Sequence, residues 1–292
     1  MSNTEFRKHP IQLSRSAFNE LFQSPAIFFP FSVLAFVQLL ILEIFFFAPR
    51  FPLSGFFGPI INKFAGSKYL IYPNNYILLD RWFNHWSVQG IVFVFLGSFF
   101  IGVAILIINS INNEGQINLP AIYKETWQRY VHLWCAALTV FSVIFFFSFL
   151  YGLIYKRALL IRSTSGGFFF IKQLVMQGAP LYQLLIALFS LAVFAYIFPI
   201  IILEKRGFFS ALVLNFKMLW SSFICILLVV IIPALLYIPL LLLKINGKLF
   251  VNVWAPEGWG MLMVCLILVT MFIDAWQYTA ITTCYILDRE SR

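Results

Sequence analysis

Six long apolar runs, separated by shorter polar stretches, divide this chain of 292 residues. Each run is about as long as the twenty or so residues that an α-helix needs to cross a hydrocarbon core of roughly 30 Å. The pattern therefore predicts an all-α integral membrane protein, with a single membrane domain over residues 1–292. The six transmembrane helices are expected at 26–48, 87–109, 132–155, 179–203, 220–243 and 259–286.

Three shorter stretches alternate apolar and polar residues at the period of an amphipathic helix. The clearest has Leu119 and Tyr123 on its apolar face and Lys124 on the opposite face. Asn118 is a suitable N-cap for this helix, and Pro120 suits its first turn. Such helices lie in the membrane surface with their apolar face toward the acyl chains. We expect interfacial amphipathic helices at 10–24, 118–131 and 208–219.

The order of these elements repeats along the chain. A shift of 90 residues aligns a span, an acidic turn, a surface helix and a further span, and it pairs Glu114 with Glu204 and Cys135 with Cys225. A negative charge at Glu204 suits the N-terminus of the surface helix that follows, so we expect it to cap that helix. Pro199 lies near the end of the fourth span and should kink it.

Composition supports the membrane interpretation. The chain is 62% hydrophobic and only 11% charged, against about 25% charged residues in ordinary soluble domains. Its net charge of +9 comes from basic residues at the ends of apolar runs, where they meet lipid headgroups. We therefore expect membrane lipids as partners and no nucleic acid.

Motifs for cofactors, metals and catalysis are absent from the sequence. The cysteines lie inside or at the edge of apolar runs without a CxxC spacing, which predicts neither disulfides nor a zinc site. No histidine pair has a metal-binding spacing, and no phosphate loop, dinucleotide fingerprint or nucleophile elbow occurs. The sequence predicts a protein without catalytic residues, cofactor or metal, and so not an enzyme. The cysteines are Cys135, Cys225, Cys265 and Cys284.

Asp274 is the sharpest candidate for a functional residue. It falls near the middle of the sixth span, where a charge costs several kcal/mol unless it is paired or protonated. Other polar residues share roughly its helical face or interrupt the first span, where Glu43 is a possible partner. They form either an interhelical hydrogen-bond network, which we favour, or the lining of a polar cavity or proton path. The set is Thr270, Asp274, Gln277, Tyr278, Thr282 and Tyr285 in the sixth span, with Gln38 and Glu43 in the first.

The last third of the chain carries a family resemblance. Its motifs are the run from Phe198-Pro199 to Glu204-Lys-Arg-Gly207, Ser210-Ala211 with Trp220 nine residues on, and the ending Thr282-Thr-Cys-Tyr285-Ile-Leu-Asp288-Arg289. They resemble the six-span membrane domain found fused to some bacterial glycerophosphodiester phosphodiesterases. The resemblance implies surface helices on the cytoplasmic side and no catalytic residues, because the chemistry belongs to a separate soluble domain. Lys and Arg are balanced between the two sides, so the expectation of cytoplasmic termini in an inner membrane follows the resemblance.

Three functions fit this pattern. The leading one is a non-catalytic multi-pass protein, acting as a structural or accessory subunit of a larger membrane complex or as a lipid-interacting module. The alternative is a small transporter or permease subunit that uses the polar stripe around Asp274. A lipid-directed enzyme is the third. A transporter needs a water-reachable cavity near the bilayer midplane lined by Asp274 or Gln38, whereas a scaffold would have that region packed shut.

Overall fold

The computed structural model describes residues 9–72, 74–77, 86–113, 115–160, 167–246 and 256–290. Over these ranges the regular structure is helical and contains no strand. Six helical segments of the described chain are long and apolar enough to cross a membrane, which confirms the predicted all-α, multi-pass class. They are Pro25–Phe47, Val88–Asn112, Leu119–Leu159, Ala179–Leu203, Ser222–Ile245 and Glu257–Glu290.

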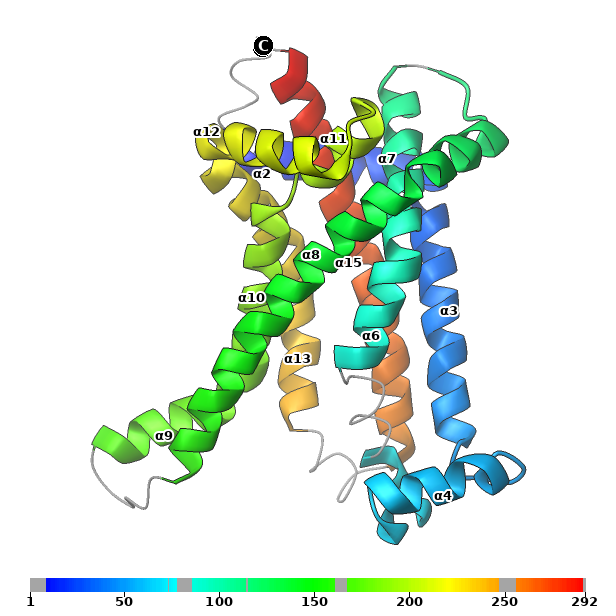
Figure 1. The fold of residues 1–292 in the computed structure, drawn as a ribbon, viewed down its shortest axis with the longest axis vertical. Coiled ribbons are helices and arrows are strands. Elements are labelled where there is room, and N and C mark those ends of the chain that lie inside the picture. Colours follow the sequence, from blue (N-terminus) through cyan, green and yellow to red (C-terminus); the bar gives the residue numbers. More distant parts are fainter. Residues whose placement is uncertain are drawn as a thin grey trace.

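Several of these spans are built from more than one helical element (Figure 1). The first joins η1 to α3, the second joins α6, η3 and α7, and the fourth joins α10 to α11. The fifth combines the second part of α12 with η4 and α13. The bounds are η1 Pro25–Ile27, α3 Phe28–Phe47, α6 Trp86–Val92, η3 Phe93–Gly97, α7 Ser98–Asn112, α8 Leu119–Leu159, α10 Ala179–Val193, α11 Ile197–Leu203, α12 Phe208–Ala234, η4 Leu235–Tyr237, α13 Ile238–Ile245 and α15 Pro256–Glu290.

The spans divide into an inner and an outer set. Buried residues make up 67% of the most apolar part of the second span, 72% of the fourth and 39% of the sixth, against 28%, 22% and 33% for the first, third and fifth. The inner helix α7 contacts α3, α8, α11 and α15. The shared core comes largely from α7, α11, α12 and α15. Alternate spans therefore form the centre of the bundle, and the spans between them face lipid.

The amphipathic helices gather at one end of the bundle. Helix α2 (Pro10–Gln23) and the first part of α12 lie across this end, where α8 also begins and α15 ends (Figure 1). The indole of Trp276 on α15 donates a hydrogen bond to the Ser14 carbonyl on α2 at 2.8 Å. Leu13, Ala17 and Leu21 are the buried apolar side of α2. We call α2, the first part of α12 and the start of α8 the amphipathic platform. Its position fits the predicted interfacial helices, because its polar side chains lie at the end of the bundle.

The third span and its surface helix are one continuous element rather than two. Helix α8 has 41 residues and starts at the predicted N-cap, because Asn118 Oδ1 accepts from the Ala121 N–H at 3.2 Å. A glycine on α7, Gly102, lies at the contact between α7 and α8. A Cβ on Gly102 would lie 2.8 Å from side-chain atoms of both Thr126 and Leu133, so any larger residue here would force these side chains to shift.

The predicted kink at Pro199 is a full break in the fourth span. Helix α10 ends at Val193 and α11 begins at Ile197, because proline cannot donate the hydrogen bond that would continue the helix. The buried side chain of Asn215 bridges the break. Its Oδ1 accepts from the Tyr196 N–H at 3.0 Å, and its Nδ2 donates to the Val193 carbonyl at 2.9 Å. A side chain from α12 thus satisfies backbone groups that the break leaves unpaired.

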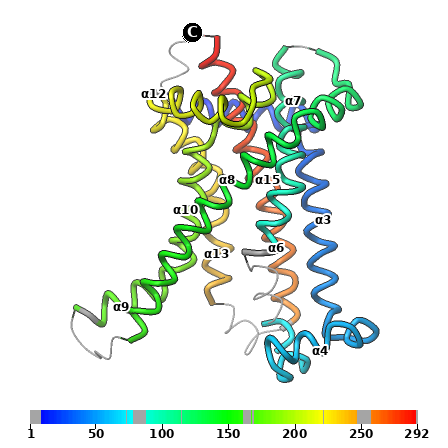
Figure 2. The backbone as a smooth tube through the Cα atoms, viewed as in Figure 1, coloured from blue at the N-terminus to red at the C-terminus, as the bar shows by residue number. Residues whose placement is uncertain are grey.

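The opposite end of the bundle is more open. Helices α4 (Ser54–Phe64) and α9 (Gly167–Gln177) lie there, on separate sides of the molecule (Figure 1). Helix α10 packs along α8, and the two run together away from α3 and α15 toward α9, as the backbone trace makes plain (Figure 2). Between the first and second spans lie the short helices α4 and η2 (Ser67–Leu70).

Candidate functional site

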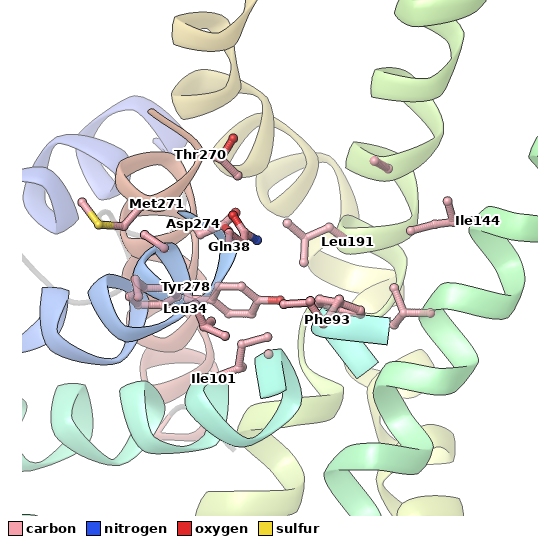
Figure 3. A pocket seen from close by; sticks show the side chains of 16 residues that line it. Leu34, Gln38, Phe93, Ile101, Ile144, Leu191, Thr270, Met271, Asp274 and Tyr278 are labelled. Atoms are coloured by element: carbon pink, nitrogen blue, oxygen red, sulfur yellow. The ribbon is translucent and has the colours of Figure 1, made fainter. Parts of the chain in front are cut away.

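A cavity of about 200 Å³ lies between the inner and outer spans (Figure 3). Five of the six spans line it: the first, second, third, fourth and sixth. Its lining residues are Phe31, Leu34, Ala35, Gln38, Val92, Phe93, Gly97, Ile101, Val140, Ile144, Ala187, Leu191, Thr270, Met271, Asp274 and Tyr278. The cavity therefore sits where α8 and α10 face α3 and α15.

The polar groups of the cavity come from two helices. Asp274, Thr270 and Tyr278 are successive turns of one face of α15, and Gln38 comes from α3. Figure 3 shows Asp274 and Gln38 on one side of the space and Leu191 and Ile144 on the other. The lining contains one carboxylate and no lysine, arginine or histidine. The site is thus a mostly apolar chamber with a polar wall.

Asp274 has no polar partner within the described parts of the chain. No hydrogen bond or ion pair joins it to another described side chain or backbone group, and the same holds for Gln38 and Thr270. The side chain is half-buried, because the cavity itself gives it exposed surface. A carboxylate in hydrocarbon without a partner is strongly destabilising, so this arrangement is suited to hold a ligand, water or a proton.

A π-helical turn forms part of the cavity wall. Residues Phe93–Gly97 make up η3, and both Phe93 and Gly97 line the space. The Tyr130 hydroxyl on α8 donates to the Phe95 carbonyl in this turn at 2.9 Å. π-Helical turns are rare and are frequent at functional sites. No pattern in the sequence marks this turn, although Gly97 and Ser98 are compatible with it.

The polar residues predicted from the sequence have different surroundings in the structure. Thr270, Asp274, Tyr278 and Gln38 line the cavity. Gln277 is buried on another side of α15, where its Nε2 donates to the Val230 carbonyl on α12 at 2.7 Å. Glu43 is exposed and lies away from the cavity lining. The stripe therefore contains both an interhelical hydrogen bond, at Gln277, and a cavity wall, at Asp274.

A second polar cluster joins α11, α12 and α15 near the amphipathic platform. Asp288 Oδ2 accepts from the Tyr196 hydroxyl at 2.6 Å and from the Ser222 hydroxyl at 3.0 Å. The Tyr196 oxygen also lies 3.1 Å from the Cys284 sulfur. Sequence reasoning did not single out Tyr196 or Ser222, because each falls within an apolar run. Their hydrogen bonds tie the end of the sixth span to its neighbours.

Glu204 belongs to this end of the molecule, and the expectation that it caps a helix is wrong. The Tyr285 hydroxyl donates to Glu204 Oε1 at 2.5 Å, and Arg206 Nε donates to Oε2 at 2.7 Å. Gly207 occupies the N-cap position of α12 without a side-chain hydrogen bond. Tertiary partners therefore take the carboxylate away from the helix end. The contact with Tyr285 also joins the end of the fourth span to the end of the sixth.

The ionisable side chains do not cluster as metal ligands. Within the described ranges, no three residues among His, Cys, Asp and Glu come together in a way that could hold a metal ion. The side-chain oxygen atoms of the cavity lining come from one carboxylate, one amide and two hydroxyl groups. The cavity chemistry is therefore that of a single acid in an apolar chamber.

The fold and the cavity define this chain as a multi-pass, α-helical membrane protein with a polar-walled chamber between its spans. No protein-family model, curated protein or solved structure matches the chain. Its function is accordingly argued from the geometry of the chamber.

Proposed function

We propose that this chain is a small membrane transporter or permease subunit that binds its solute at Asp274. The observation that carries the proposal is the unpartnered Asp274 carboxylate at the wall of a cavity of about 200 Å³. Ionisable residues inside membrane spans usually mark substrate or ion pathways when they face an internal space. A transporter needs this cavity to be reachable by water, whereas a packed scaffold needs no open space at Asp274.

The comparison with Gln277 supports this reading. Gln277 and Asp274 are one turn apart on α15, yet Gln277 bonds to Val230 on α12 as a structural residue would. If Asp274 had the same structural role as Gln277, its carboxylate would be expected to have a hydrogen-bond or ion-pair partner. The broken α10–α11 span and the π-turn η3 add support, because discontinuous helices are common around the binding sites of transporters.

A structural or accessory role in a larger complex, or a lipid-interacting role, is the second candidate. The observation that favours it is the set of exposed large apolar side chains on the lower half of α8, among them Phe145, Phe146, Phe149 and Leu153. Such a surface suits lipid or another subunit. We propose no catalytic role in either case, and a cavity lining with a single carboxylate supports this proposal. The resemblance to the six-span domain also leads us to propose an inner membrane and cytoplasmic termini.

Thiol labelling of the cavity wall tests the transporter proposal. Thr270→Cys, in a Cys265→Ala background, should react with a small ammonium-bearing methanethiosulfonate reagent added to the protein in lipid vesicles. Leu268→Cys is the matched control on the same helix, because Leu268 is 46% exposed and faces away from the cavity. We expect Thr270→Cys to react at least about tenfold faster, since thiols in hydrocarbon do not ionise to the reactive thiolate.

Intact-protein mass measures the labelling, and unfolding in detergent should make both variants fully reactive. If Thr270→Cys reacts no faster than Leu268→Cys in the folded protein, the cavity is closed to water and the scaffold reading is correct.

A further inference from the structure

We infer that the ligand of the Asp274 cavity is a small organic cation, an amine with an apolar body. This inference rests on the proposed function and specifies its substrate class. It follows from four properties of the cavity: its charge, the distribution of its oxygen atoms, its size and its aromatic side chains.

The charge of the lining selects against anions. When it is ionised, Asp274 supplies a negative charge, and the lining residues include no basic side chain to balance it. An anionic solute would place a second negative charge beside the carboxylate in a medium of low dielectric constant, where like charges repel strongly. A cation would pair with Asp274 and remove the penalty of an isolated charge.

The oxygen atoms lie on one wall only. Asp274, Thr270 and Gln38 come from α15 and α3, whereas the wall from α8 and α10 is made of Val140, Ile144, Ala187 and Leu191. Hard metal ions prefer six or more oxygen ligands that surround them. A solute with a charged head toward Asp274 and a hydrocarbon body toward Leu191 matches the two walls.

The size of the cavity agrees with such a solute. A volume of about 200 Å³ is several times the roughly 30 Å³ that one water molecule occupies. A dehydrated monatomic ion would leave most of it empty or filled with water against apolar side chains. A compact organic molecule would fill the chamber and bury its own apolar surface.

Aromatic side chains next to the carboxylate complete the argument. The rings of Phe31 and Tyr278 stack with their centroids 6.0 Å apart, and both residues line the cavity together with Phe93. The faces of aromatic rings attract ammonium groups, and the attraction is larger where water is excluded. A carboxylate beside aromatic rings is therefore a suitable environment for an amine.

Three probes of similar shape and different charge test the inference. Binding of 2-phenylethylamine, 2-phenylethanol and 3-phenylpropanoate to the purified full chain is measured by equilibrium dialysis at neutral pH. We expect the amine to bind and the alcohol and the carboxylate to fail to displace it. Asp274→Asn should weaken amine binding by about thirtyfold or more, because it removes one partner of a desolvated charge pair. Glu43→Gln, which removes an exposed carboxylate, should bind like the wild type.

The outcomes separate this inference from the proposed function. Protection of Thr270→Cys from labelling by the amine, and not by the alcohol, supports both. Rapid labelling of Thr270→Cys without amine binding would support a water-reachable cavity. It would refute the inference that the ligand is an amine. Asp274-dependent binding of sodium ions that the amine does not displace overturns it as well. Equal amine affinity in wild type and in a folded Asp274→Asn variant places the ligand elsewhere and also refutes the inference.

Discussion

Polar side chains inside this protein differ in whether the fold gives them a partner. Gln277 and Asn215 are buried and bonded to backbone groups of neighbouring segments. Asp274 opens to a cavity and bonds to no described residue. In hydrocarbon an unpaired polar group is costly. A polar residue inside a span that has no protein partner is therefore a better guide to function than a polar residue that is buried and hydrogen-bonded.

Glu20 shows the same principle at the membrane surface. It is half-buried on α2, its Oε1 has no hydrogen-bond partner among the described residues, and burial raises its pKa from the usual 4.5 to about 7. Between these two values the folded protein holds a proton that the unfolded chain releases. The stability of the fold should therefore fall as the pH rises from 4.5 to about 7, and no further above it.

Glu20→Gln should remove this dependence, because the amide stays neutral at every pH. We expect the variant to be more stable than the wild type at pH 8 and similar to it at pH 5, as measured by thermal unfolding in detergent. Glu43→Gln controls for the change in net charge. A wild-type pH profile that persists in Glu20→Gln would show that another group is responsible.

The break in the fourth span is the clearest feature at the scale of secondary structure. Pro199 explains why the helix stops, but not why the break is stable. Its stability depends on α12, whose Asn215 accepts from the Tyr196 N–H and donates to the Val193 carbonyl. The break and the helix that bridges it are thus one packing unit.

Asn215→Leu tests this unit, because leucine has a similar volume and no polar atoms. It leaves one N–H and one carbonyl buried and unpaired, which should lower the free energy of unfolding by about 2 to 4 kcal/mol. Asn246→Leu is the matched control. Asn246 also donates to a backbone carbonyl, that of Leu242 at 3.0 Å, but it is exposed at the end of α13, so its loss should change stability by about 0.5 kcal/mol or less.

Denaturant unfolding in detergent measures both variants. Equal effects at the two positions would mean that the backbone groups at the break find other partners, and that Asn215 does not hold α10 and α11 together.

The whole molecule is organised by its two unlike ends. Helix α2, the first part of α12 and the start of α8 share the end at which α15 finishes, whereas α4 and α9 lie at the other (Figure 1). Each inner span contacts an amphipathic element: α7 contacts α8, α11 contacts α12, and α15 contacts α2. The last of these contacts joins the last helix of the described chain, α15, to the first, α2.

This arrangement predicts which surface positions face the same side of the membrane. Arg15→Cys, Lys124→Cys and Lys217→Cys replace exposed basic residues on α2, α8 and α12, and Lys63→Cys replaces one on α4. In sealed vesicles, a membrane-impermeant maleimide should label the first three from one side and the fourth from the other. Labelling of all four from the same side would contradict six crossings. If the cytoplasmic side is the one that labels Arg15→Cys, the proposed orientation holds.

The class of the protein follows from local patterns in the sequence. Hydropathy and helical period are properties of consecutive residues, so six spans, the N-cap at Asn118 and the kink at Pro199 are recorded locally. The surface helix predicted at 118–131 and the span predicted at 132–155 are both present, but they form one continuous helix, α8, because no break separates them.

The partners of the polar residues, in contrast, depend on how the helices pack. Asp274 and Gln277 are three positions apart, and the packing of α12 against one face and a cavity on another gives them different surroundings. Glu204 bonds to Tyr285, which is far away in the sequence. Such contacts depend on the relative rotation and spacing of helices, and a cavity is the space that their side chains leave unfilled. Neither quantity is encoded in a short stretch of chain.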